Sequence, residues 1–193
     1  LYIACEKGHV DAARLLLEKG AKVDRAKKNG MTPLYVACHN GHVAVARLLL
    51  NKGAKVDRVD KWGNTPLLIA CQEGHSSIVA LLEEHIYPLH AAAKTDDVDA
   101  MTQLIDGGAV VDQTKEDGAT PLWVACRNCH VDAARMLLEK GADVNRAKGN
   151  GATPLYIACE KGHVDVARLL LEKGADVDRA MEDGTTPLFI ACQ

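Results

Sequence analysis

The sequence predicts an all-α fold, a solenoid of stacked antiparallel helix pairs with β-hairpin loops that project between successive pairs. The tripeptide Thr-Pro-Leu recurs along the 193-residue chain, and a variant, Tyr-Pro-Leu, occurs once. The prolines of these tripeptides are Pro33, Pro66, Pro88, Pro121, Pro154 and Pro187, so the successive spacings are 33, 22, 33, 33 and 33 residues. A period near 33 is typical of an array of stacked units, each too small to bury its own apolar face.

Each unit is expected to begin with a short helix. In the unit of residues 29–61, Thr32 is a good N-cap because its hydroxyl can accept a hydrogen bond from an amide one turn into the helix. Pro33 suits the first helical position, where its missing N–H costs nothing. Small residues such as Ala37 let a neighbouring helix come close, and Gly41 can end the helix in a left-handed conformation.

A second helix and a loop complete the unit. The second helix is expected to begin near Val43 and to end at Gly53. It carries Leu48–Leu50 and is apolar on more than one side, as is typical of a helix packed between neighbours. The charged stretch from Ala54 to Trp62, which turns at Gly63, is expected to form the projecting hairpin.

The repeated unit resembles the ankyrin repeat. The resemblance rests on Gly30–Leu34, Ala37, Gly41–Val43, Leu48–Leu50 and Gly53–Asp57, and it returns in the units that begin near Lys61, Asp117, Asn150 and Asp183. Ankyrin repeats usually have a histidine after Thr-Pro-Leu that hydrogen-bonds to the threonine. This position instead holds Tyr35, Leu68, Trp123, Tyr156 and Phe189, while the one histidine there, His90, follows Tyr87. No repeat therefore keeps the complete threonine–histidine pair.

We expect a single array of about seven repeat units over residues 1–193, with partial first and last units. The 22-residue spacing indicates that 11 residues, a whole hairpin, are missing near residues 85–88. The helix over 77–84 should then lead through three extended residues, which span about 10 Å, into the next helix. The expected result is a tight turn and an unbroken stack, in which the fourth unit is completed by Leu89, Ala92, Val98, Met101, Leu104 and Ile105. Two blocks splayed apart at His85–Tyr87 are the alternative.

Charge and hydropathy argue against some classes of protein. The formal net charge is −3 and the isoelectric point is near 6.2, which disfavours a nucleic-acid-binding surface. The sequence has no apolar run of 18 residues and no visible signal peptide, so we expect no membrane insertion. Because the chain begins at Leu1 rather than Met, we interpret it as a fragment. We expect it to be a monomer in the cytoplasm or nucleus.

Six of the seven cysteines occupy one position of the repeat: Cys5, Cys38, Cys71, Cys126, Cys159 and Cys192. Stacked helices lie about 8–10 Å apart, whereas a disulfide requires Cα atoms closer than roughly 7 Å. These thiols are therefore expected to be small buried apolar groups in a reducing compartment.

The string Cys126-Arg127-Asn128-Cys129-His130 has the form of a c-type haem attachment site. The repeat explains most of it, because Cys126 and His130 occupy regular repeat positions and only Cys129 is new, in place of a glycine. We therefore expect no haem at this string. We also expect no zinc or redox site, since no second pair of ligands accompanies the two cysteines.

Histidines equivalent to His130 recur as His9, His42, His75 and His163. They stand one helix pair apart and cannot converge on one metal ion, so we expect them to cap the second helices locally. The chain contains no constellation of nucleophile and base outside the repeat pattern. We therefore expect no catalytic residues, no cofactor, no metal and no enzyme activity.

Five of the seven aromatic residues occupy the position after the tripeptide: Tyr2, Tyr35, Trp123, Tyr156 and Phe189. We expect them to stack from repeat to repeat as a structural ladder, with a continuous binding stripe as the alternative. Trp62 differs because it lies in a hairpin beside Gly63, where ankyrin repeats present variable residues to partners; packing of this hairpin against its neighbour is the alternative.

The resemblance implies a protein-interaction module, a scaffold or adaptor that binds a partner protein through its hairpin tips and the concave surface of its first helices. Trp62 is the expected anchor, because aromatic residues dominate binding hot spots. The full set of expected contact residues is Lys27, Lys28, Asn29, Met31, His39, Asn40, Lys61, Trp62, Asn64, Gln72, Glu73, Arg127, Asn128, Glu182 and Asp183. A regulatory or spacer segment tethered to an enzyme or channel domain is the alternative.

Charge differs between the hairpins, with a net +3 over residues 22–29 and a net −3 over residues 176–183. A partner that used this difference would be acidic towards Lys27 and Lys28 and basic towards Glu182 and Asp183. Solvated turns whose charges are screened are the alternative. The resemblance also implies that Asn145, in Asp-Val-Asn, is a candidate for asparagine hydroxylation.

Overall fold

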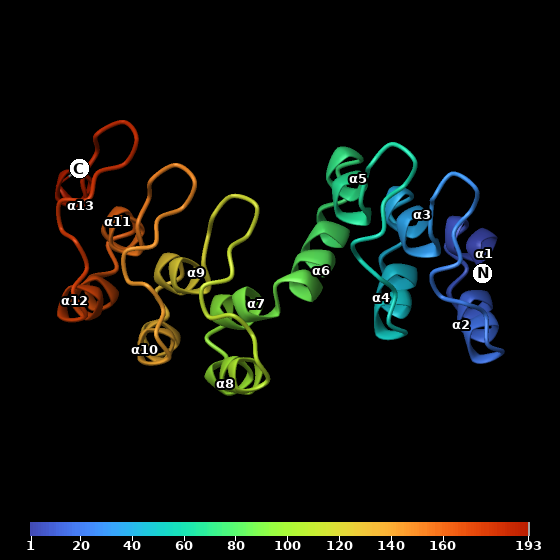
Figure 1. Ribbon diagram of the computed structural model, residues 1–193, viewed down its shortest axis with the longest axis horizontal. Helices are drawn as coiled ribbons and strands as arrows, with labels where there is room; N and C mark the ends of the chain where they lie inside the picture. Colours follow the sequence, from blue (N-terminus) through green and yellow to red (C-terminus); the bar gives the residue numbers. More distant parts are fainter. Residues whose placement is uncertain (193) are drawn as a thin grey trace. The chain divides into compact units, whose positions relative to one another are not determined.

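The computed structural model describes residues 1–192, which form thirteen helices and contain no strand (Figure 1). The chain divides into two compact units at the shortened repeat. The first unit covers Leu1–Ile86, and the second begins at Tyr87. The predicted all-α architecture is confirmed.

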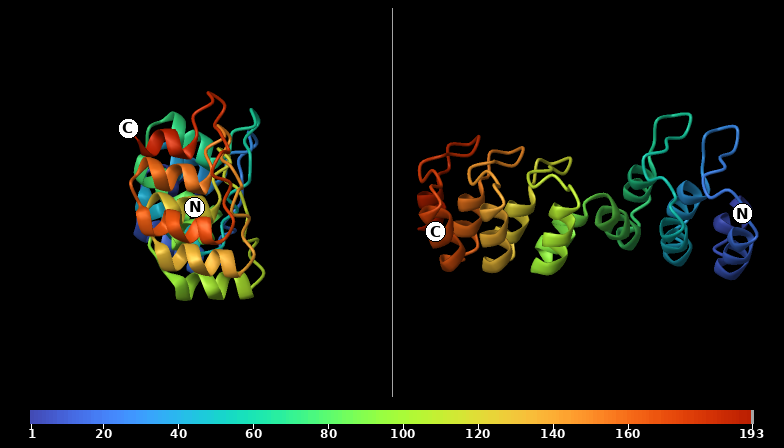
Figure 2. Two further views of the ribbon diagram at one scale, coloured as in Figure 1. Left: turned by 90° about the vertical axis from the view of Figure 1, so that its left-hand side faces the viewer. Right: turned by 60° about the horizontal axis from the view of Figure 1, so that its bottom comes forward.

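The first unit contains three helix pairs. They are α1 (Tyr2–Glu6) with α2 (Val10–Glu18), α3 (Pro33–His39) with α4 (Val43–Asn51), and α5 (Pro66–Gln72) with α6 (Ser76–Ile86). The first helices α1, α3 and α5 pack side by side in one row, and the second helices α2, α4 and α6 form another. Figure 2 shows these rows and the loops that link each second helix to the next first helix.

The second unit repeats this arrangement. Its first helices are α7 (Pro88–Lys94), α9 (Pro121–Arg127), α11 (Pro154–Glu160) and α13 (Pro187–Ala191). Its second helices are α8 (Val98–Asp106), α10 (Val131–Glu139) and α12 (Val164–Glu172). Each first helix packs on the next first helix, and each second helix packs on the next second helix.

Threonine caps fix where the first helices start. The hydroxyls of Thr32, Thr65, Thr120, Thr153 and Thr186 each accept a hydrogen bond from the backbone N–H three residues later, over 3.0–3.2 Å. A proline follows each cap at the first helical position. The predicted cap and proline are therefore confirmed in every Thr-Pro-Leu repeat.

Each unit has its own core of interlocking leucines. The buried leucines include Leu34, Leu49 and Leu82 in the first unit and Leu122, Leu137 and Leu170 in the second. In the predicted fourth helix pair, Leu89 and Met101 are fully buried, and Leu104 and Ile105 pack against the same core.

The shortened repeat differs from the prediction at its end. Helix α6 continues to Ile86, so one residue, Tyr87, separates it from α7 instead of three extended residues. Ile86 stands where the other long repeats have a glycine such as Gly53, so nothing stops the helix before the residue that precedes Pro88. The expected unbroken stacking of all repeats stays a prediction.

The projecting loops are turns rather than regular β-hairpins. In the loop before α3, the N–H of Lys27 donates to the carbonyl of Met31, and the N–H of Gly30 donates to the carbonyl of Lys27, both over 3.0 Å. Gly30 adopts a left-handed φ of 83° at the turn. One such closure per loop forms no strand within residues 1–192, so the predicted hairpins are present only as tight turns.

Candidate functional site

The loop tips of neighbouring repeats are joined by one backbone hydrogen bond. The carbonyl of Asn29 accepts from the N–H of Lys61 over 2.9 Å, and the carbonyl of Asp117 accepts from the N–H of Gly149 over 2.9 Å. A longer contact of 3.5 Å joins Asn150 to Glu182 in the same way. Each of these three tips is therefore braced by the next loop of its unit.

Side-chain oxygens brace the base of the loops that have a following loop in their unit. Asp24 accepts from the backbone N–H of Lys55 over 3.0 Å, and Asp112 accepts from that of Asp143 over 3.0 Å. Asn145 occupies the same repeat position, and its Oδ1 accepts from the N–H of Asp176 over 2.8 Å. The candidate hydroxylation residue thus performs the same bracing as its aspartate equivalents.

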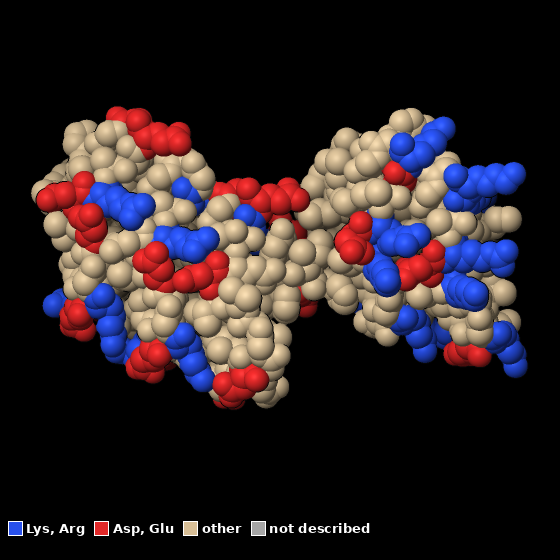
Figure 3. Space-filling model, viewed as in Figure 1, with Lys and Arg blue, Asp and Glu red and all other residues tan. Residues whose placement is uncertain are grey.

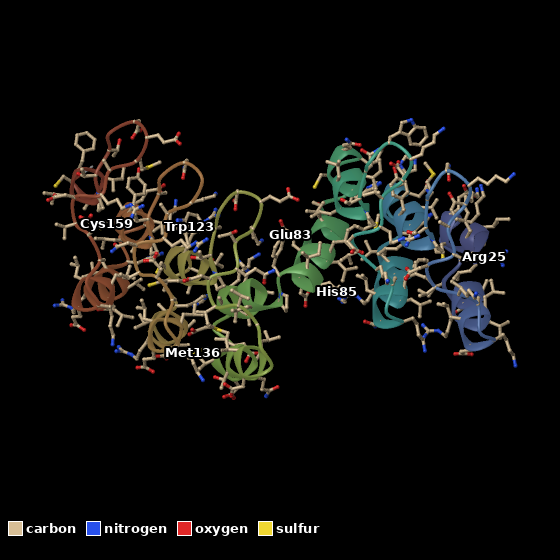
Figure 4. The ribbon with its side chains drawn as sticks, viewed as in Figure 1. Arg25, Glu83, His85, Trp123, Met136 and Cys159 are labelled. Atoms are coloured by element: carbon tan, nitrogen blue, oxygen red, sulfur yellow. The ribbon has the colours of Figure 1, made fainter. Side chains whose placement is uncertain are left out.

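The aromatic residues of the first helices do not form the expected ladder. The ring–ring contact found within residues 1–192 joins Tyr87 to His90 instead. Two of the rings contact a lysine of the next loop: the Lys27 ammonium lies 3.8 Å from the centre of the Tyr2 ring, and the Lys148 ammonium lies 4.8 Å from that of Trp123. A charge from the following loop therefore covers each of these rings, which favours a structural role over a binding stripe. Figure 4 shows Trp123 among the side chains of the second unit.

Tyr35 makes a different contact with its next loop. Its hydroxyl donates to Oδ2 of Asp60 over 2.9 Å, and both residues are buried. Asp60 stands where three other loops have Lys27, Lys115 and Lys148 and the last loop has Met181. The aspartate therefore replaces a cation over the ring with a hydrogen-bond acceptor for the tyrosine.

Asp60 organises the second loop. Its Oδ1 accepts from the N–H groups of Trp62 and Asn64, each over 2.9 Å, and its Oδ2 also accepts from the Asn64 amide. Burial alone would raise the pKa of Asp60, but the hydrogen bonds from Asn64, Tyr35 and Trp62 outweigh it and lower the pKa. Burial, together with the bond to Asp60, raises the pKa of Tyr35 to about 12.

Trp62 projects from this braced loop. Its side chain is 64% exposed, although its backbone is held by Asp60. The Lys61 ammonium lies 4.3 Å from the centre of the indole ring. A large exposed aromatic on a fixed loop has the properties of a binding anchor.

Histidines bridge successive repeats instead of capping their own helices. The N-cap residues of α4, α10 and α12 make no side-chain cap hydrogen bond; they are His42, His130 and His163. The equivalent residue before α6 is His75. The Nε2 of each histidine lies 2.9–3.1 Å from a backbone carbonyl at the end of the first helix of the previous repeat, and it donates a hydrogen bond to that carbonyl. The predicted local capping is wrong, because the ring reaches backwards across the repeat boundary.

The predicted contact residues fall into two groups in each unit: loop tips and the carboxyl ends of first helices. In the first unit the tips carry Lys27, Lys28, Asn29, Met31, Lys61, Trp62 and Asn64, and the helix ends carry His39, Asn40, Gln72 and Glu73. In the second unit the helix end carries Arg127 and Asn128, and the tip carries Glu182 and Asp183. All fifteen are exposed or half-buried, as a contact surface requires.

Some of these side chains already have partners. His39 and Glu73, on neighbouring helix ends, lie 3.4 Å apart. The amides of Asn40 and Asn128 donate to carbonyls of their own helices. Arg127 lies 5.7 Å from the centre of the Trp123 ring. These helix-end side chains are therefore partly held in place within the protein.

Charge differs between the two units as predicted from the sequence. Figure 3 shows blue side chains over the first loop, where Lys22, Arg25, Lys27 and Lys28 are exposed, and red ones over the loop before α13. Glu182 and Asp183 are exposed in that last loop.

The cysteines are not uniformly buried. Cys5, Cys38 and Cys126 are buried, Cys159 is half-buried, and Cys71 and Cys192 are exposed. The prediction is wrong for the last two because no further first helix of their unit packs over them. Burial raises the pKa of the Cys38 thiol to about 12 and also raises that of Cys126. These buried thiols are therefore unreactive at neutral pH.

Cys129 adopts a left-handed backbone conformation with φ 64°, and Asp96 at the same repeat position has φ 58°. Within residues 1–192, no group of three or more His, Cys, Asp or Glu side chains is placed to hold a metal ion. None of the helices in this range has both the length and the apolar character needed to cross a membrane.

Comparisons with known proteins agree with this architecture. Residues 1–87 match a family model described as ankyrin repeats (3 copies), and residues 122–171 and 157–193 match one described as ankyrin repeats (many copies). The crystal structure of the human ASB11 ankyrin repeat domain is similar, with 33% sequence identity and a TM-score of 0.57. The alignment covers 98% of this chain and 90% of that one. A comparison with curated proteins gave no match.

Proposed function

Because this chain belongs to the ankyrin-repeat family, whose members are generally protein–protein interaction modules, we propose that it binds a partner protein through the loop tips and first-helix ends of its first unit. The exposed Trp62 on its hydrogen-bonded loop is the observation that carries the proposal. Because the loop is already fixed, binding costs little conformational entropy. Binding needs no covalent chemistry or cofactor.

Charge complements this anchor. The basic loop of residues 22–29 lies directly beside the Trp62 loop, since Lys61 and Asn29 are hydrogen-bonded. An acidic segment of the partner would be attracted to Lys27 and Lys28, and the charge would mainly accelerate association. The acidic loop with Glu182 and Asp183, in the second unit, would attract a basic segment. We expect the protein to act as a monomer in the cytoplasm or nucleus, where its buried cysteines stay reduced.

Site-specific photo-crosslinking in extract from a native source tests the proposal. A photoreactive amino acid at position 62 should give a discrete adduct with one partner protein. The same amino acid at position 47 is the matched control, because Arg47 is also exposed but lies in the second-helix row, on α4. Adducts from position 47 and none from position 62 would contradict the proposal.

A further inference from the structure

The loop of residues 54–64 lacks the neighbour that braces other loops. The chain is 11 residues short between α6 and Pro88, and by alignment with the repeat before it these are the equivalents of residues 54–64 themselves. In the other repeats, one loop supplies the hydrogen-bond acceptors and the next loop supplies the N–H donors. The loop of residues 54–64 has the acceptors, but the loop that would supply the donors is missing from the sequence.

Three groups are left uncovered as a result. The Trp62 carbonyl is equivalent to those of Asn29 and Asp117, but no next-loop N–H donates to it. The Asp57 carboxylate is equivalent to that of Asp24, and it is exposed. Leu68 occupies the ring position of the first helix and is 43% exposed, whereas Tyr35, Trp123 and Tyr156 at that position are 3–9% exposed.

The other repeats show which groups a following loop supplies at the equivalent position. Each covering loop donates two backbone N–H groups six residues apart, such as those of Lys55 and Lys61 or of Asp176 and Glu182. The residue just before the second donor contacts the residue that follows Pro-Leu in the preceding first helix. Asp60, which precedes Lys61, contacts Tyr35 in this way. Over Leu68, that residue must be apolar to gain from burial.

The charge of the loops around this place indicates the charge of the segment that would bind there. The open loop has a net charge of +1 over residues 55–62, and the loop beside it has +3 over residues 22–29. Lys55, Arg58 and Lys61 are all exposed on the open loop. An acidic segment is therefore favoured over a basic one.

We propose that Asp57, the Trp62 carbonyl and Leu68 form a docking site for an acidic loop of the partner protein, which takes the place of the missing hairpin. This inference rests on the proposed function and specifies what binds beside Trp62. The partner loop donates two backbone N–H groups, to Asp57 and to the Trp62 carbonyl, and lays an apolar side chain on Leu68. Trp62 itself packs along the edge of the docked segment.

A peptide from this chain is a suitable probe. Residues 175–185 carry a net charge of −3 and place Met181 directly before Glu182, and this segment already braces the loop before it. Cyclised and labelled with a fluorophore, the peptide should bind the whole protein in a fluorescence anisotropy titration. N-methylation at Asp176 and Glu182 removes both donors and should weaken binding about tenfold or more.

Two protein variants test the location of the site. Insertion of residues 175–185 between Ile86 and Tyr87 supplies the missing hairpin and should abolish peptide binding. Leu68→Asp should weaken binding about tenfold without unfolding, because the side chain is already exposed. Val164→Asp is the matched control, since Val164 is 65% exposed on α12 and should leave binding unchanged.

Failure of this inference can be distinguished from failure of the proposed function. A peptide that does not bind the wild-type protein, or binds the insertion variant equally well, overturns the docking site. Crosslinking of the partner from position 62 that is unaffected by the insertion also overturns it, while the proposed function stands. Crosslinking that disappears with the insertion supports the docking site.

Discussion

Replacing Tyr35 with phenylalanine removes one hydroxyl, and we expect it to lower the free energy of unfolding by about 1.5 kcal/mol. The hydroxyl lies 2.9 Å from Oδ2 of Asp60, and both side chains are buried. A hydrogen bond to a charged group contributes about 1.5–3 kcal/mol. The lower end applies because Asp60 keeps its bonds from Trp62 and Asn64 in the variant.

Urea denaturation followed by circular dichroism measures this loss. Tyr2→Phe is the matched control, since Tyr2 holds the same repeat position and its hydroxyl lies 3.8 Å from the sulfur of Met31. A contact that weak predicts a change below about 0.5 kcal/mol. A double-mutant cycle of Tyr35→Phe with Asp60→Ala should return a coupling energy of about 1 kcal/mol or more. Equal losses for Tyr35→Phe and Tyr2→Phe would refute the reasoning.

Four further predictions concern the loops and the helix ends. The pKa of Asp60 is lowered in the folded state, so the carboxylate stabilises the fold above the unfolded pKa near 4, and this stabilisation is lost as the pH falls through the folded pKa. The difference in free energy of unfolding between wild type and Asp60→Asn, measured by urea denaturation, should therefore narrow below about pH 4. A difference that is constant with pH would contradict this. Cys129→Gly should raise the free energy of unfolding by about 0.5–1 kcal/mol, since relief of the left-handed strain exceeds the added chain entropy; a loss of stability would show that the strain is absent. Trp62→Ala should cost about 2 kcal/mol in affinity for the crosslinked partner, by isothermal titration calorimetry, with an unchanged melting temperature. Charge reversal at Lys27 and Lys28 should mainly slow association and flatten its salt dependence in stopped-flow measurements, and an effect confined to dissociation would contradict the steering role.

Local signals made the helices predictable. A threonine followed by proline sets the start of a helix through contacts within four residues, and a glycine with positive φ ends it, as Thr32, Pro33 and Gly41 show. The helix end at Ile86 was not predicted: the helix was expected to stop at residue 84, but this repeat has no glycine to end it and the helix continues to Ile86.

Contacts between repeats were harder to predict because they depend on pairs of distant positions. Tyr35 and Asp60 are 25 residues apart, and the aspartate replaces the lysine that three other loops have at this position. The histidine bridges left no comparable signal in the sequence, because their acceptors are backbone carbonyls, which every residue carries. The exposed position of Trp62 was predictable because a loop tip leaves a large side chain without a neighbour.

Hydrogen–deuterium exchange of the protein with and without the crosslinked partner tests most directly whether the loop tips carry the function. The account predicts slower exchange on binding in residues 22–31 and 55–64, with little change in the second helices α2 and α4. Protection confined to α2 and α4, with both loops unchanged, would contradict it.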